Sequence, residues 1–208
     1  MPSTGRDGAA AGLARERLDC GVINGWHGWF GTFNGVVLLT MIALPLAVLT
    51  VWVLARRRTA AGDPHAWRTS VAEVGIVYGT VPWVWMIMLP GDQAGVVSGR
   101  VSLVPLRDLV TVLGADPLTV TVQVVGNLLV FAALGFFGPM RFAALASVPR
   151  VLALAAGCSV LVEVAQYALR LDRVSSVDDV LLNTAGAGLA ALASRRWWRT
   201  PASVRARP

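Results

Sequence analysis

The sequence predicts an all-α fold, a polytopic bundle of about five transmembrane helices with a short interfacial helix in one outer loop. Of the 208 residues 55% are hydrophobic and only 14% are charged, a composition too apolar for a soluble domain. Apolar runs of about 20 residues, the length that crosses a bilayer, recur along the chain. The arginines, which supply all the basic charge, cluster in particular segments between these runs.

Four apolar runs are long enough to predict one membrane span each. They cover residues 36–55, 71–89, 118–137 and 151–169. A fifth run, Val180 to Ala193, is short by itself. It reaches full length over residues 178–197 when the Trp197-Trp198 pair lies in the headgroup layer, where tryptophan is enriched.

The predicted transmembrane domain covers residues 34–198 and has a different kind of segment on each side. Residues 1–33 are expected to form a disordered tail, rich in Ala, Gly and Arg, followed by an aromatic lead-in at the membrane interface. Residues 199–208 are expected to form a basic cytoplasmic tail.

The loop between the second and third spans, Pro90 to Pro117, is longer than a simple connection needs. Part of it has a helical period, with apolar residues at i, i+3, i+4 and i+7: Leu106, Leu109, Val110 and Leu113. This pattern predicts a short amphipathic helix that lies in the outer membrane interface.

The positions of the arginines predict the orientation of the bundle, because Arg is strongly biased to the cytoplasmic side while acidic residues matter little. With the N-terminus outside and the C-terminus inside, eleven of the 18 arginines fall in cytoplasmic segments, and the other seven share the outside with nine acids. Topology thus explains the net charge of +6, and nucleic acid is not expected as a partner. Two isolated Cys and two His predict neither a metal site nor a cofactor.

Polar side chains inside the spans form stripes, and each needs a partner or a role because hydrocarbon is a poor solvent for it. The fourth span has polar residues at helical spacing from Ser159 to Arg170, and shorter stripes occur on the third and fifth spans. All three stripes have members in the outer half of the membrane. If they face one another, they line an outward-opening recess with these candidate ligand-binding residues: Asn127, Ser159, Glu163, Gln166, Arg173, Asp178, Asp179 and Asn183.

Structural roles are the alternative for many of these residues. The amides and Ser159 suit hydrogen bonds between helices, with Gly126, Gly157 and Gly186 permitting close approach. Either Asp178 or Asp179 is expected to cap the fifth helix, leaving the other acid to pair with Arg173.

For Glu163 we favour a functional role, because a lone carboxylate in hydrocarbon must gain a proton or a cation. Arg170, two helical turns further along the chain, is its nearest cationic candidate by sequence, and Arg173 is the next.

The chain resembles the VanZ-like family of small bacterial membrane proteins over residues 101–192. The resemblance rests on short blocks in a fixed order: Leu103-Val104-Pro105; Gly126-Asn127-Leu128-Leu129-Val130-Phe131 with Gly135; Ser159 through Gln166; Arg173; and Asp178 through Ala187. The sequence departs from the family pattern at Ala133, where proline is usual, so the third helix is expected to be straighter. Ser102, Leu106 and Ser176 replace the commoner Asn, Phe and acid.

The resemblance implies a multi-pass protein of the bacterial cytoplasmic membrane and links the family to low-level teicoplanin resistance, without any agreed catalytic activity. Three functions stay open. The first is non-enzymatic binding of a lipid-linked envelope precursor or a glycopeptide in the recess. The second is an intramembrane enzyme with Glu163 or Asp179 as general base. The third is a small transporter. The lipid bilayer is the expected partner in each case, and a homo-oligomer is compatible with each function.

Overall fold

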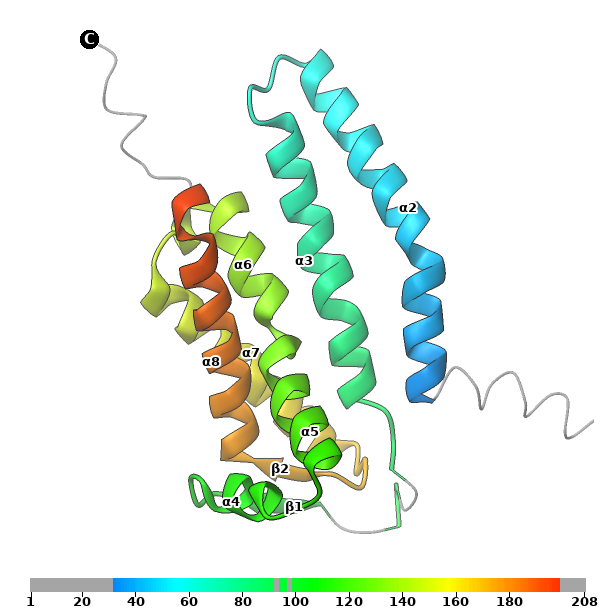
Figure 1. Cartoon of the computed structure of the whole chain (residues 1–208), viewed down its shortest axis with the longest axis vertical. Helices are drawn as coiled ribbons and strands as arrows, with labels where there is room; N and C mark the ends of the chain where they lie inside the picture. Colours follow the sequence, from blue (N-terminus) through cyan, green and yellow to red (C-terminus); the bar gives the residue numbers. More distant parts are fainter. Residues whose placement is uncertain (1–31, 92–93, 97–98, 199–208) are drawn as a thin grey trace, which may run out of the picture.

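The computed structural model describes residues 32–91, 94–96 and 99–198, and the described chain forms a helical bundle (Figure 1). Its elements, in chain order, are α2 (Phe33–Ala60), α3 (Ala66–Ile87), β1 (Arg100–Ser102), α4 (Arg107–Leu113), α5 (Pro117–Val130), α6 (Ala132–Arg141), a 3-10 turn (Ala143–Leu145), α7 (Val148–Ala168), β2 (Val174–Ser176), α8 (Val177–Ser194) and a second 3-10 turn (Arg195–Trp197). The predicted N-terminal tail, nearly all of its aromatic lead-in and the C-terminal tail lie outside the described residues.

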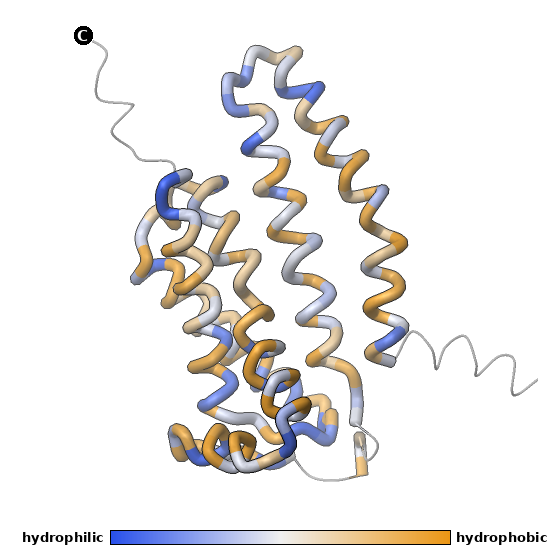
Figure 2. The backbone as a smooth tube through the Cα atoms, viewed as in Figure 1, coloured by the Kyte–Doolittle hydropathy of each residue, from blue (hydrophilic) through white to orange (hydrophobic). Residues whose placement is uncertain are grey.

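Four helical segments are long and apolar enough to cross a membrane: Phe33–Ala60, Ala66–Ile87, Pro117–Arg141 and Val148–Ala168. Apolar residues predominate along α2, while hydrophilic residues gather at the connection from α2 to α3 (Figure 2). The predicted fold class is therefore confirmed: the chain is an all-α, multi-pass membrane protein. The helix α8 exists as predicted but does not meet this test, and its first turn carries Asp178 and Asp179.

The helix α8 lies among other helices, since it packs against α5, α6 and α7. Its buried face consists largely of small residues, including Gly186, Ala187 and Ala191. A Cβ atom at Gly186 would overlap the carbonyl group of Leu128, and one at Gly135 would overlap that of Ala187. The backbones of α5 and α6 thus approach the backbone of α8 so closely that only glycine fits at the contact positions.

Two of the three glycines expected to permit close helix packing do not have that role. A Cβ added at Gly126 or at Gly157 would meet nothing within 4 Å, whereas Gly186 makes the predicted close approach. The expectation for Gly126 and Gly157 was wrong, because helical spacing places a glycine on a face without specifying how near the next helix comes.

The third predicted span is interrupted, although the absence of proline at position 133 predicted a straighter helix. The chain leaves helical geometry at Phe131 (φ −113°, ψ 12°), between α5 and α6. Phe131 and its neighbour Val130 are buried in the core. The expectation of a straighter helix was wrong: the span breaks without a proline at position 133, between two helices that both pack against α8.

The loop between α3 and α5 folds over one end of the bundle. The predicted amphipathic helix is present as α4, and Val110 and Leu113 on it are exposed. The strand β1 pairs in parallel with β2, and Arg100 lies opposite Val174. We refer to the end that carries α4, β1 and β2 as the sheet end (Figure 1).

Arginines and one acid tie the helices together towards the opposite end, where α2 connects to α3. Arg58 Nη2 lies 2.5 Å from Glu73 Oε2, and Arg141 donates from Nε to the other carboxylate oxygen. Glu73 thereby links α2, α3 and α6. The C-terminal end of α8, with Arg195 and Arg196 just beyond it, lies at the same end of the bundle (Figure 1).

Candidate functional site

The polar stripes of the three predicted spans face one cavity of about 450 Å³ near the sheet end. Side chains from α5, α7 and α8 and from the segment before β2 line it: Gln123, Asn127, Glu163, Gln166, Arg173, Asp179 and Asn183. We call this cavity the polar recess. Six of the eight predicted site residues therefore lie around one space, and their role as a ligand site stays a prediction.

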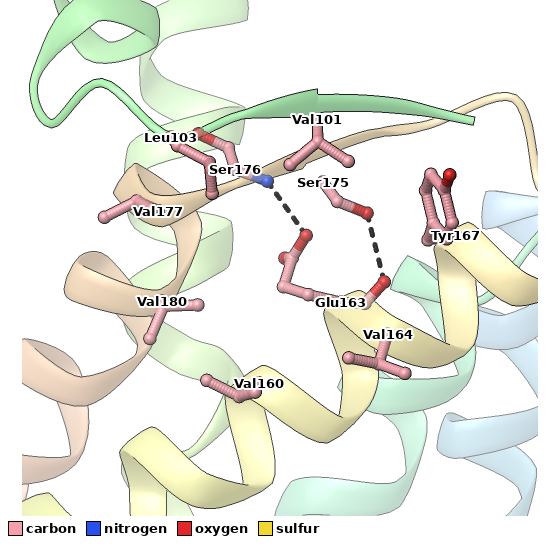
Figure 3. Close-up of a pocket in the computed structure, with 10 residues that line it drawn as sticks. All are labelled: Val101, Leu103, Val160, Glu163, Val164, Tyr167, Ser175, Ser176, Val177 and Val180. Carbon is pink, nitrogen blue, oxygen red and sulfur yellow. Dashed lines mark hydrogen bonds between the residues drawn. The ribbon is translucent and has the colours of Figure 1, made fainter.

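Glu163 is 9% exposed, and its contacts come from the segment that leads into α8. Its Oε2 accepts a hydrogen bond of 3.0 Å from the backbone N–H of Ser176, and its carbonyl oxygen accepts one of 3.0 Å from Ser175 Oγ (Figure 3). None of the ion pairs among the described residues includes Glu163.

Glu163 therefore forms no ion pair with Arg170, its nearest cationic candidate by sequence. Arg170 lies just beyond the end of α7, where it adopts a left-handed conformation (φ 50°) and is exposed. The chain turns away at this residue, so helical spacing no longer predicts where its side chain lies.

Asp179 supplies a second carboxylate to the recess. Its Oδ1 accepts a hydrogen bond of 2.6 Å from Asn127 Nδ2, so α5 and α8 are joined at this point. Arg173 attracts Asp179 electrostatically, while the carboxylates of Glu163 and Asp179 repel each other. The recess thus combines two acids with one arginine, and a ligand that carries a cation or hydrogen-bond donors would relieve the repulsion.

Asn183 is the deepest polar group of the recess and is 1% exposed. Its Nδ2 donates to Ser159 Oγ at 2.8 Å, but its buried Oδ1 has no hydrogen-bond partner among the described residues. An unsatisfied buried acceptor costs about 1–3 kcal/mol, and such groups usually have a water or ligand as partner. Ser159 is fully buried and does not line the recess, so it acts by orienting Asn183.

Asp178 does not face the recess. It is 3% exposed, and its carboxylate accepts hydrogen bonds from the backbone N–H groups of Leu106 (2.5 Å) and Leu109 (2.9 Å). Asp178 therefore holds the N-terminus of α4.

The prediction that Asp178 or Asp179 caps α8 was wrong. Ser176 is the cap, since its Oγ accepts from the N–H of Asp178 at 3.2 Å. The same hydroxyl donates to Asp108 at 2.6 Å. Hydrogen bonds from Ser102 and Ser176 lower the pKa of Asp108, so this link to α4 stays ionised at neutral pH. The two aspartates do lie in the first turn of α8, where they complement its dipole.

Replacing Asp178 with Ala should release α4 from the bundle. A hydrogen bond to a charged group contributes about 1.5–3 kcal/mol, and the substitution removes two of them. We expect amide hydrogen exchange at Leu106 and Leu109 to accelerate at least tenfold, with little change in the middle of α7. Asp178→Asn, which keeps one acceptor, is the matched control and should give an intermediate rate. Unchanged exchange in Asp178→Ala would show that other contacts hold α4.

One wall of the recess could not be predicted from the sequence. It consists of apolar side chains from α2, α3 and the residues just after α3: Phe33, Trp83, Met86, Ile87 and Leu89. Gln166 Nε2 donates to the carbonyl oxygen of Ile87 at 2.8 Å and joins α7 to this wall. Apolar residues in apolar helices do not reveal that they line a cavity. Ser176, in contrast, had the usual signal of a helix cap, a serine directly before an acidic first turn.

These features define a class: a multi-pass membrane protein whose helices enclose a polar recess with two acids, one arginine and buried amides. A model of the VanZ/LLP1 family matches residues 76–198, more than half of the chain. The protein therefore belongs to the VanZ-like family. No curated protein and no solved structure matches the chain. The matched region contains every residue that lines the recess except Phe33.

Proposed function

We propose that the protein binds a cell-envelope ligand in its polar recess, at the outer side of the bacterial cytoplasmic membrane, and so affects envelope physiology or susceptibility to glycopeptides such as teicoplanin. The observation that carries the proposal is the convergence of Glu163, Asp179 and Asn183 on one cavity, where the buried Oδ1 of Asn183 lacks a donor. The cavity volume of about 450 Å³ lies in the usual range for small-molecule sites.

Structural hydrogen bonds account for only part of the polar content of the recess. Asn127, Gln166 and Asn183 each use their amide nitrogen to join helices, as the structural alternative expected. The buried Asn183 Oδ1 has no hydrogen-bond partner among the described residues, and Glu163 takes part in none of their ion pairs. A recess built only for helix association would not leave a buried acid without a cation and a buried acceptor without a donor.

The arginines support an orientation with the sheet end outside. The C-terminal ends of α2, α6 and α8 lie at the other end; α2 and α6 carry arginine in their last turns, and Arg195 and Arg196 directly follow α8. The positive-inside rule then makes that end cytoplasmic. In this orientation the recess lies in the outer half of the membrane, within reach of envelope molecules.

An intramembrane enzyme is the second candidate, with Glu163 or Asp179 as base and Arg173 holding an anionic group. The structure offers this candidate little support. Ser159, the possible nucleophile, accepts a hydrogen bond from Asn183 and lies outside the recess. Transport is a third candidate, for which Glu163 would be the titrating group. A turnover assay and a proteoliposome flux assay would detect these two activities.

A deletion strain complemented with recess variants tests the binding proposal. Glu163→Gln keeps an acceptor for the Ser176 N–H, and Asp179→Asn keeps one for Asn127, so both variants should fold. We expect each to lose most of the complementation of teicoplanin susceptibility and of envelope-stress phenotypes. Leu161→Ala, a change at an exposed position of α7, is the control and should complement fully. Full complementation by both recess variants at normal expression would show that the polar residues of the recess serve only helix packing.

A further inference from the structure

A second cavity of about 290 Å³ lies beside the polar recess, between α7 and α8 and beneath β1 (Figure 3). Its lining is almost entirely apolar: Val101, Leu103, Val160, Val164, Tyr167, Val177 and Val180. Ser175, Ser176 and Glu163 are the remaining lining residues. We call this cavity the apolar groove.

Glu163 borders both cavities, so the apolar groove and the polar recess adjoin at this residue. Figure 3 shows the Glu163 side chain directed towards Ser176, with Val101 and Leu103 above it and Val160 and Val164 below it. An apolar cavity and a polar cavity that share an acid in their linings have the form of a site for an amphiphilic molecule.

The groove is on the outer surface of the bundle. Val160, Val164 and Tyr167 are each about half exposed, and Leu103 is 72% exposed. In a membrane these side chains face hydrocarbon, so a lipid chain has direct lateral access to the groove.

We infer that the ligand of the polar recess is a lipid, whose hydrocarbon chain lies in the apolar groove and whose headgroup enters the recess past Glu163. This inference rests on the proposed function. It commits to one occupant because the groove adjoins the recess and bears no charge except that of Glu163.

The groups around the recess specify the headgroup. Glu163, Asp179 and the free Oδ1 of Asn183 are acceptors and require hydrogen-bond donors on the ligand, such as an ammonium or hydroxyl groups. Arg173 suits an anionic group, and a phosphate is the anion most common in lipid headgroups. The expected ligand is therefore a lipid phosphate with a donor-bearing headgroup.

Binding of defined lipids to the purified full-length protein, followed by native mass spectrometry, tests the inference. The probes are didecanoyl-phosphatidylethanolamine, the phosphatidylcholine of the same chain length, which has no headgroup donors, and water-soluble glycerophosphoethanolamine. Wild-type protein should bind the ethanolamine lipid at least tenfold more tightly than either of the other two. Equal binding of all three probes would overturn the inference.

Two variants on α7 separate the chain site from the headgroup site. Val164→Trp fills the groove, while Leu161→Trp adds the same bulk at an exposed position that lines neither cavity. We expect Val164→Trp to weaken binding of the ethanolamine lipid at least tenfold and Leu161→Trp to leave it unchanged. Equal affinity of the two variants would refute the chain site and leave the proposed function intact. Unchanged binding of the ethanolamine lipid by Glu163→Gln would refute the headgroup site, whereas the proposed function itself fails only if the recess variants complement the deletion strain fully.

Discussion

Replacing Gly186 with Ala should lower the free energy of unfolding by about 3 kcal/mol or more, the upper end of the usual cost of overpacking. The added methyl group would overlap the carbonyl of Leu128, which is backbone and cannot move without displacing α5 from α8. The same displacement would strain the hydrogen bond between Asn127 and Asp179, which joins these two helices. Thermal unfolding of the purified protein in detergent measures the effect.

Gly157→Ala is the matched control for this substitution. It adds the same methyl group to the interior of α7, where nothing lies within 4 Å of the new atom. Because Ala is a better helix former than Gly by about 1 kcal/mol, this variant should be as stable as the wild type or slightly more stable. A similar loss of stability in both variants would show that α5 and α8 are not in the close contact described.

Replacing Gly126 with Leu should abolish function while the protein remains folded. Gly126 lines the polar recess, and a Cβ atom at this position meets nothing within 4 Å, so a larger side chain can grow into the cavity without striking the backbone. Leucine also favours the helix. We therefore expect near-complete loss of complementation in the deletion strain, with an unfolding temperature close to that of the wild type.

Gly157→Leu is the control for the recess-filling variant, because Gly157 is equally open but lies outside the recess. It should retain both stability and complementation. If Gly126→Leu complements as well as Gly157→Leu, the recess is not needed for function.

Local patterns in the sequence were sufficient for the elements that depend on local physics. Apolar runs located the long helices, and the period of Leu106, Leu109, Val110 and Leu113 located α4. Polar stripes on three spans correctly indicated a shared cavity, because a polar residue in hydrocarbon must face the protein interior.

Features that depend on how distant segments meet did not follow from the sequence. No proline marks the break at Phe131, which lies between two helices that both pack against α8. The parallel pairing of β1 with β2 joins segments more than 70 residues apart, and each strand has only three residues. Asp178 illustrates the same difficulty, since its partners on α4 become visible only when the outer loop is folded.

The apolar groove could not be predicted from the sequence either, because its valines on α7 and α8 resemble any residues that face lipid. The strand β1 turns that surface into a groove by covering it, and the position of β1 depends on its pairing with β2. Glu163 was singled out as a buried acid, but its place between two cavities is a property of the tertiary structure.

Photocrosslinking in living cells tests the binding role of the recess most directly. A benzophenone amino acid would replace Val122, which lines the recess, or Val125, an exposed residue of the same helix that does not. The mass of any small-molecule adduct would then be measured, in wild-type and Glu163→Gln backgrounds. We expect a defined lipid adduct from position 122 that is absent from position 125 and strongly reduced by Glu163→Gln. The same adducts at both positions, unaffected by Glu163→Gln, would show that the recess holds no specific envelope ligand.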